Sequence, residues 1–186
     1  MHDLRAITPL GRSEPVVEVH GTVTMTEVTD VALASVAARR GREPETLAAL
    51  ERVLGDAPPD PGCLGGNTLT AFWMGPDLWM IEAPIDTHED LAAQLAALSS
   101  GAMSVTEQTD AWCRFDLTGD RLADVFERLC AANIRTFQGG ESVRTTIHHL
   151  GCYILCRTPA HMSVIGARSS AGSLHHALRT ALLSAL

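Results

Sequence analysis

The sequence contains no lysine, because all 14 of its basic residues are arginine. Reactions that need a lysine amine, such as Schiff-base formation, are therefore excluded for this chain. The same absence excludes a covalent pyridoxal link and the phosphate-binding lysine of a P-loop.

The sequence is also short of positive charge and of long apolar runs. Its formal net charge of −8 argues against nucleic acid and against an anionic membrane surface, since both attract basic faces. No apolar run approaches the roughly 20 residues that span a bilayer. The first residues, MHDLRAITPLGRSEP, contain no apolar stretch of a secretory signal, so we expect a cytoplasmic protein. The five scattered cysteines favour reduced thiols over a disulfide framework.

Familiar catalytic signatures are missing from the sequence. It has no G-x-G-x-x-G phosphate fingerprint, no G-x-S-x-G nucleophile turn and no C-x-x-C pair. Gly65-Gly66 and Gly139-Gly140 lie in expected loops and are not followed by a suitable helix. No catalytic, cofactor-binding or metal-binding residue is therefore predicted.

The length and composition indicate a globular protein with a hydrophobic core. The chain has 186 residues, 46% of them hydrophobic and 19% charged, which fits one domain or one domain of two similar halves. We expect an extended N-terminal arm over 1–15 and a single α+β domain over 16–186. Residues 16–28 alternate and are β-branched, which predicts one or two strands. The Pro- and Gly-rich segments 55–67 and 138–142 are expected loops.

Four helices are predicted from apolar periodicity and capping residues. Thr87 is the expected N-cap of one of them, and Gly55 is the expected end of another. Ser169 or Ser170 is the expected cap of the last one. The four predicted ranges are 45–55, 87–98, 119–130 and 169–183.

Two stretches of the chain repeat the same pattern. Residues 71–95 and 154–178 align without a gap at an offset of 83, so that Trp79 corresponds to Met162 and Leu91 to Leu174. Each copy reads as strand, Pro-containing turn, strand and capped helix. We interpret this as a repeated structural unit.

Residues 31–40 present a conflict between local sequence and the repeat. Asp30 as a cap, several alanines and Gly41 as an end favour a helix, whereas the repeat favours a strand. We predict a strand, because tertiary context commonly overrides local propensity. The chain then consists of two similar β-α-β-β-α halves, about 31–98 and 105–183. This predicts an α+β fold with antiparallel sheets and helices on one face.

Trp73 and Trp79 flank a Gly-Pro-Asp turn in a chain that is only 4% aromatic. They could pack on the core or form part of a protein–protein surface. Because Met replaces tryptophan at the corresponding position of the second copy, we favour packing.

Arg168, Ser169 and Ser170 lie at an expected helix start. Unpaired N–H groups there could hold an anion, and ordinary helix capping is the alternative.

The remaining cysteine, histidine and acidic residues of interest do not form a recognisable chemical site. Cys152 and Cys156 share one face of an expected strand about 13 Å apart, too far to share a metal, and we interpret them as core thiols. His148-His149 on an expected strand and His175-His176 on an expected helix do not chelate as pairs, although several histidines could still assemble in space. Glu107 and Asp110 could form an acid–base pair, but a surface or capping role is favoured.

Several strings resemble the gamma subunit of heterotetrameric sarcosine oxidase over about residues 20–186. The most specific is FWMGPDLWMIEAP, and the others are TEVTDVALASVAARRGRE, SVTEQTDAWCRFDLTGD, FERLC, RTTIHHLGCYI and HMSVIGARSSAGSLHHAL. The resemblance implies a fold like the folate-binding domain of glycine-cleavage aminomethyltransferases.

The same resemblance implies a function. The whole enzyme of that family oxidatively demethylates sarcosine, coupled to tetrahydrofolate. This chain would be an accessory, non-catalytic subunit that serves assembly and stability. It would hold no cofactor itself, because FAD, FMN, NAD, zinc and tetrahydrofolate belong to other subunits. The implied partners are the alpha, beta and delta subunits.

Two alternatives stay open at this stage. One is a free-standing folate-binding protein similar to the aminomethyltransferases or to their iron–sulfur-assembly relatives. Gly151-Cys152-Tyr153 is similar to part of the relatives' K-G-C-Y-x-G-Q-E signature, but the lysine and the x-G-Q are not present, so no site residue is assigned from it. The other is an interaction domain with an unrelated partner.

Overall fold

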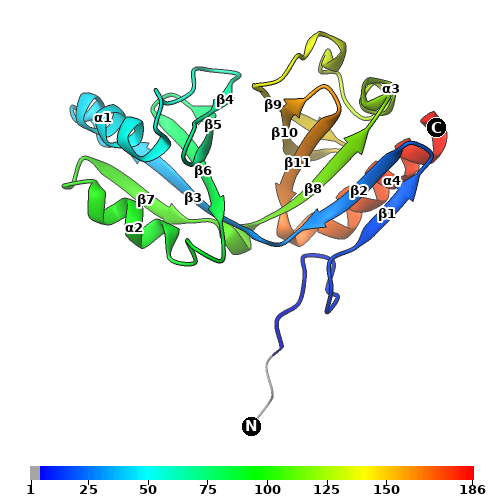
Figure 1. Cartoon of the computed structure of the whole chain (residues 1–186), viewed down its shortest axis with the longest axis horizontal. Coiled ribbons are helices and arrows are strands. Elements are labelled where there is room, and N and C mark those ends of the chain that lie inside the picture. The colour runs from blue at the N-terminus through cyan, green and yellow to red at the C-terminus, as the bar shows by residue number, and fades with distance from the viewer. Residues whose placement is uncertain (1–4) are drawn as a thin grey trace. The chain divides into compact units, whose positions relative to one another are not determined.

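The computed structural model describes residues 5–186 and divides into two compact units. Met1–Thr29 and Ala111–Leu186 form the first, which we call the discontinuous unit, and Asp30–Asp110 form the continuous unit. Each contains one antiparallel sheet with helices (Figure 1). The predicted α+β class with antiparallel sheets is therefore confirmed.

The continuous unit is built on a five-stranded sheet. Its strand order is β4-β5-β6-β3-β7, and every neighbouring pair is antiparallel. The strands are β3 (Val31–Ala38), β4 (Leu64–Gly65), β5 (Thr70–Gly75), β6 (Leu78–Pro84) and β7 (Met103–Glu107), and the helices are α1 (Glu43–Leu54), α2 (Leu91–Leu98) and the short 3₁₀ helix η1 (Thr109–Ala111).

The discontinuous unit is built on a six-stranded antiparallel sheet of order β1-β2-β8-β11-β10-β9. Its strands are β1 (Val17–His20), β2 (Val23–Val28), β8 (Trp112–Gly119), β9 (Glu141–Ile147), β10 (Leu150–Thr158) and β11 (His161–Ala167). Its helices are α3 (Leu122–Phe126) and α4 (Ala171–Ala185), with the 3₁₀ helices η2 (Ile134–Thr136) and η3 (Arg168–Ser170).

Each unit has its own hydrophobic core between one face of its sheet and its helices. In the continuous unit, Leu50 and Leu54 of α1 and Leu91 and Leu95 of α2 pack with inward residues of the strands. In the discontinuous unit, α3 and α4 pack on alternate residues of β8, β10 and β11. Side chains on a strand alternate between faces, so the intervening residues lie on the other face of each sheet.

The sequence repeat is a repeat of strand register. Trp79 pairs with Val36 in the continuous unit, and Met162 pairs with Leu117 in the discontinuous unit, which corresponds to offsets of 83 (162 − 79) and 81 (117 − 36). The hairpins β5–β6 and β10–β11 keep the offset of 83 on both strands, since Trp79 pairs with Trp73 and Met162 pairs with Cys156. β6 and β11 also have the same order of buried and exposed positions.

β3 and β8 occupy corresponding places in the two sheets, but the strand that pairs with each on the side away from β6 or β11 differs between the units. In the continuous unit, β7 follows α2 along the chain and pairs with β3. In the discontinuous unit, the corresponding place beside β8 is taken by β2, which comes from the N-terminal part of the chain. The N-terminal segment therefore completes a sheet whose other strands begin more than 80 residues later (112 − 28).

Residues 31–38 form a strand, as the repeat predicted. β3 pairs with β6 on one side and with β7 on the other. Its small residues Ala32, Ala34 and Val36 are fully buried. A central strand with a closely covered face requires small side chains, which explains why the local sequence is rich in alanine and therefore similar to a helix.

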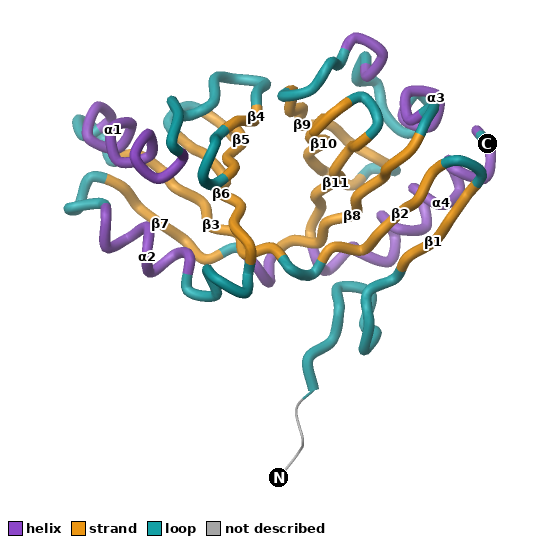
Figure 2. Tube along the Cα trace, viewed as in Figure 1, coloured by secondary structure: helices purple, strands orange, loops and turns teal. Residues whose placement is uncertain are grey.

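Two predicted helices differ from the structure by more than two residues at an end, whereas the other two agree with α1 and α4 to within two residues. The one predicted over 87–98 begins at Leu91, because residues 84–88 form a turn in which the His88 N–H bonds the Pro84 carbonyl; Thr87 is therefore not the cap. The one predicted over 119–130 is limited to α3, a short purple segment in Figure 2. Beyond Phe126 the N–H of Leu129 bonds the Phe126 carbonyl in a tighter turn.

Candidate functional site

The two tryptophans of the Gly-Pro-Asp hairpin face each other across β5 and β6. Trp73 and Trp79 are direct partners in the strand register. Trp79 is 5% exposed, belongs to the core of the continuous unit, and donates its indole N–H to the Pro59 carbonyl at 3.0 Å. Trp73 is half-buried against the same core. Trp79 therefore holds the proline-rich loop 55–67 against the sheet.

This geometry predicts a clear difference between the two tryptophans. Trp79→Phe removes the indole donor, leaves the Pro59 carbonyl without its partner and opens space in the core, so we expect the free energy of unfolding to fall by about 2–3 kcal/mol. Trp73→Phe, at a half-exposed position, should cost less than about 1 kcal/mol. Urea unfolding of both variants measures this, and equal losses would contradict the assignment.

Arg168, Ser169 and Ser170 form η3 and lead directly into α4. Arg168 donates from Nη2 to the Ile7 carbonyl at 2.9 Å, which fixes the N-terminal segment. Ser170 occupies the N-cap position of α4 but makes no side-chain capping bond. It also lines a small hollow of about 140 Å³. The sequence-based anion or interface role for these residues stays a prediction.

Glu27 is a buried carboxylate that reasoning from the sequence missed. It is 1% exposed and accepts the backbone N–H of Leu10 at 2.8 Å and that of Val16 at 3.0 Å. A buried carboxylate needs such donors, because an unpaired one would be strongly destabilising. Glu27 therefore attaches residues 10–16 to the sheet. The only sequence signal was an acidic residue in an otherwise apolar and hydroxyl-bearing strand.

Asp116 on β8 is the centre of a polar network on the sheet face opposite the helices. Arg114 binds both of its carboxylate oxygens, at 2.7 and 2.8 Å, and His161 Nε2 lies 2.9 Å from Oδ2. Burial alone would raise the pKa of Asp116, but the hydrogen bonds and charge of Arg114 and the hydrogen bonds of His161 and Ser163 outweigh it and lower the pKa. The carboxylate stays ionised and links side chains of β8 and β11, so it is unsuited to donating a proton.

A second polar cluster joins β1 to α4. Glu18 accepts a hydrogen bond from His20 at 2.9 Å and lies 3.3 Å from Arg179. His175 Nε2 is 3.5 Å from Glu18 Oε1 without making a hydrogen bond, and its ring contacts Phe115. Burial lowers the pKa of His175, although the charge of Glu18 acts in the opposite direction. For Glu18, burial raises the pKa, and His20, His175 and Arg179 together lower it further than burial raises it.

These shifts predict that the protein loses stability as the pH falls. The pKa of His175 is lower in the folded chain than its usual 6.5, so the unfolded chain binds more protons and stability decreases through that range. Glu18 adds a second loss below its usual 4.5. Urea unfolding between pH 7.5 and 5.5 should show a shallower decrease for His175→Gln than for the wild type. An identical slope would contradict this assignment.

Cys152 and Cys156 are core residues, as interpreted from the sequence. Cys113, Cys152 and Cys156 are buried in the discontinuous unit's core. Burial raises the pKa of Cys113 and Cys156 to about 11 and that of Cys152 to about 12. A thiol needs to ionise to act as a nucleophile, so these three are unreactive at neutral pH.

The expected strand position of His148-His149 is wrong. The two residues form the two-residue turn between β9 and β10, with φ values of 51° and 70°. The strand pairing ends at Ile147 and Leu150, which leaves the histidines as the connection. His175 and His176 lie on α4 as expected. Within residues 5–186, no group of three or more His, Cys, Asp or Glu side chains is arranged to hold a metal ion.

Glu107 is a capping residue at the end of β7. The Glu107 carboxylate accepts the N–H of Thr109 at 2.9 Å and its hydroxyl, which caps the turn into η1, where Asp110 lies. This agrees with the capping role favoured from the sequence. In the described part of the chain, no helix is both long and apolar enough to cross a membrane.

No protein-family model and no curated protein sequence matches the chain significantly. Solved structures do match it. A chain of the heterotetrameric sarcosine oxidase from Corynebacterium sp. U-96, determined in complex with pyrrole 2-carboxylate, is 21% identical with a TM-score of 0.75, and the match covers 91% of this chain and 89% of that one. Aminomethyltransferase T of the glycine cleavage system from Bartonella henselae is 12% identical with a TM-score of 0.61, covering 86% of this chain and 46% of that one. The resemblance seen in the sequence is therefore confirmed as a resemblance of fold, shared with a sarcosine oxidase chain and with aminomethyltransferase T.

Proposed function

We propose that this chain is the accessory gamma subunit of a heterotetrameric sarcosine oxidase and serves the assembly and stability of the complex. The observation that carries the proposal is the extent of the structural match. It covers nearly the whole of this chain and nearly the whole of the sarcosine oxidase chain, whereas it covers less than half of aminomethyltransferase T. The sequence strings that resemble the gamma subunit support the same assignment.

The local chemistry supports a non-catalytic role. Asp116 is ion-paired with the guanidinium of Arg114. Glu27 accepts backbone hydrogen bonds from the N-terminal segment. Three of the thiols are buried, and their pKa values are raised. Each of these groups has a structural task that would compete with acid–base or nucleophilic chemistry. We therefore assign the oxidative demethylation of sarcosine to the other subunits.

The proposal extends to cofactors, partners and compartment. The partners are the alpha, beta and delta subunits, which together would hold FAD, FMN, NAD, zinc and tetrahydrofolate. This chain would hold none of them. The enzyme would work in the cytoplasm, and Trp73 and Arg168 are candidates for contact with another subunit.

Co-expression tests the proposal. A tagged form of this chain, produced with the alpha, beta and delta subunits, should retain all three through affinity and size-exclusion steps. The purified complex should show the visible absorption of bound flavin, and the chain purified alone should not. A chain that elutes alone beside folded partners would overturn the proposal.

The second candidate is a free-standing folate-binding protein, favoured by the fold shared with aminomethyltransferase T. It predicts saturable binding of tetrahydrofolate by the isolated chain in calorimetry. A flat titration together with co-purification of the other subunits would decide for the accessory subunit.

A further inference from the structure

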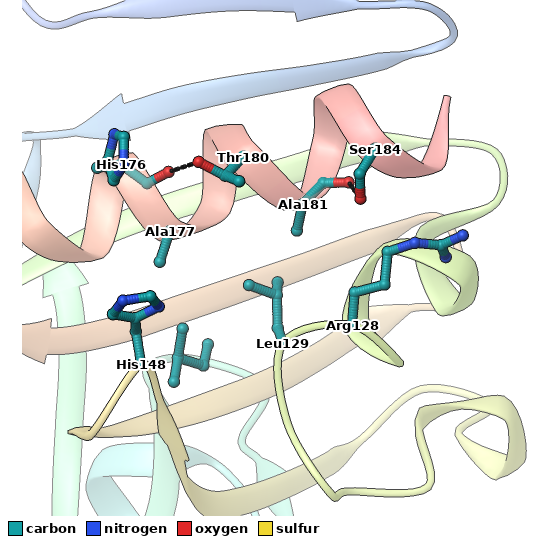
Figure 3. A pocket seen from close by; sticks show the side chains of 9 residues that line it. Arg128, Leu129, His148, His176, Ala177, Thr180, Ala181 and Ser184 are labelled. Atoms are coloured by element: carbon teal, nitrogen blue, oxygen red, sulfur yellow. Dashed lines mark hydrogen bonds between the residues drawn. The ribbon is translucent and has the colours of Figure 1, made fainter.

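The discontinuous unit has a surface hollow of about 380 Å³ between the end of α3, the β9–β10 turn and α4 (Figure 3). Its floor is apolar and is formed by Leu129, Ile147, Ala177 and Ala181. The two alanines are four residues apart and so lie on one face of α4, where their short side chains leave room. The volume is within the range of small-molecule sites, about 300–1,000 Å³.

The two ends of the hollow are polar. Arg128 lies at one end, and His148 and His176 lie at the other, with Leu129 between them (Figure 3). None of the described residues that line the hollow is acidic. In a chain with a net charge of −8, this is a local concentration of hydrogen-bond donors suited to anions.

Arg128 has no carboxylate partner within residues 5–186, although acids are close in sequence. Asp124 is paired with Arg121 and Arg135, and Glu127 is paired with Arg135. Arg128 itself donates only to the backbone carbonyl of Asp124. Its charge is therefore available to an external anion.

The turn at the other end of the hollow is strained. A two-residue hairpin turn with positive φ at both central positions is usually built from Asn-Gly or Gly-Gly. Here His148 and His149 occupy both positions. Unfavourable backbone conformations of this kind cluster at ligand sites, and the turn places the His148 ring at the hollow (Figure 3).

We propose that this hollow binds a linear aliphatic dicarboxylate. One carboxylate accepts hydrogen bonds from the guanidinium of Arg128. The methylene chain lies over Leu129 and the alanines of α4, and the second carboxylate accepts hydrogen bonds from His148 and His176. The proposal goes beyond the role in a sarcosine oxidase and does not depend on it.

A series of three acids tests the geometry on the full chain. Adipate carries two carboxylates, hexanoate carries one on a chain of the same length, and acetate has one with almost no apolar body. Histidine and backbone amide resonances should shift saturably with adipate, and hexanoate should bind roughly tenfold more weakly because one set of charged hydrogen bonds is lost. Acetate should not reach saturation at millimolar concentration.

Matched variants locate the site. Arg128→Gln and His148→Asn should each weaken adipate binding roughly tenfold or more. His149→Asn changes the neighbouring position of the same turn, whose side chain lines a different hollow, and should bind adipate like the wild type. Asparagine tolerates positive φ, so both turn variants keep the hairpin. Absence of saturable shifts, equal binding of adipate and hexanoate, or unchanged binding by Arg128→Gln would overturn the proposal.

Discussion

Deleting residues 1–28 is expected to unfold the discontinuous unit. The deletion removes β2, whose Val23 and Met25 are 0% and 1% exposed in the core, and leaves the long edge of β8 unpaired. Burial of two such side chains stabilises by about 3–6 kcal/mol, which is comparable to the whole stability of many domains, about 5–15 kcal/mol. Backbone amide spectra should therefore lose the dispersed signals of residues 111–186.

The continuous unit supplies an internal comparison in the same experiment. Its core is formed by residues within 32–105, so its amide signals should persist in the deletion variant. A shorter deletion of residues 1–6 is the matched control, because it keeps Leu10 and Val16, the partners of Glu27. We expect its stability to stay within about 0.5 kcal/mol of the wild type. Dispersed signals from residues 111–186 after the longer deletion would show that β2 is not needed.

The repeat was the most informative part of the sequence. An offset found from one proline and a few apolar positions relates the two hairpins β5–β6 and β10–β11, and their register has the same offset, as the pairs Trp79–Trp73 and Met162–Cys156 show. Strand register is set by which face of a strand is buried, and the local sequence determines that face through its alternation of apolar and polar residues. The same reasoning identified 31–38 as a strand against its local propensity.

Long-range polar contacts were not predictable in the same way. Glu27 meets the backbone of Leu10, and Asp116 meets His161 across 45 residues. Nothing in local periodicity indicates which distant donor a buried carboxylate will find, because that depends on how the strands are ordered. The position of β2 beside β8, which corresponds to that of β7 beside β3, was unpredictable for the same reason. It required knowledge of the sheet order, which the sequence repeat alone does not contain.

The predicted length of the helix over 119–130 was wrong for a local reason. Apolar spacing predicted residues 119–130 as one helix with Leu122, Val125, Phe126 and Leu129 on one stripe. The first three are buried, and Leu129 is only partly buried. These three residues lie within little more than one turn of helix, and tighter turns follow before Leu129. Periodicity therefore identified the buried face correctly but not where the helix ends.

Gly119→Ala is expected to be among the most damaging single substitutions in the chain. Gly119 ends β8 at φ 138°, a conformation that side chains with a Cβ rarely adopt. A Cβ added there would lie 2.1 Å from the Thr22 carbonyl oxygen and 3.0 Å from the Val23 Cα, both of which are backbone atoms. Relief requires β2 to move away from β8 at the pair Val23–Gly119.

The loss in unfolding free energy should be about 3 kcal/mol or more, since backbone strain and a backbone clash act together. Gly172→Ala is the matched control, because Gly172 lies in α4 with no atom within 4 Å of an added Cβ. Alanine should stabilise that helix by roughly 0.5–1 kcal/mol. Chemical unfolding of the two variants should thus give shifts of opposite sign. A small loss of unfolding free energy for Gly119→Ala would mean that the β1–β2 hairpin can move away from β8 at little cost. That result would also contradict the expectation that deleting β2 unfolds the unit.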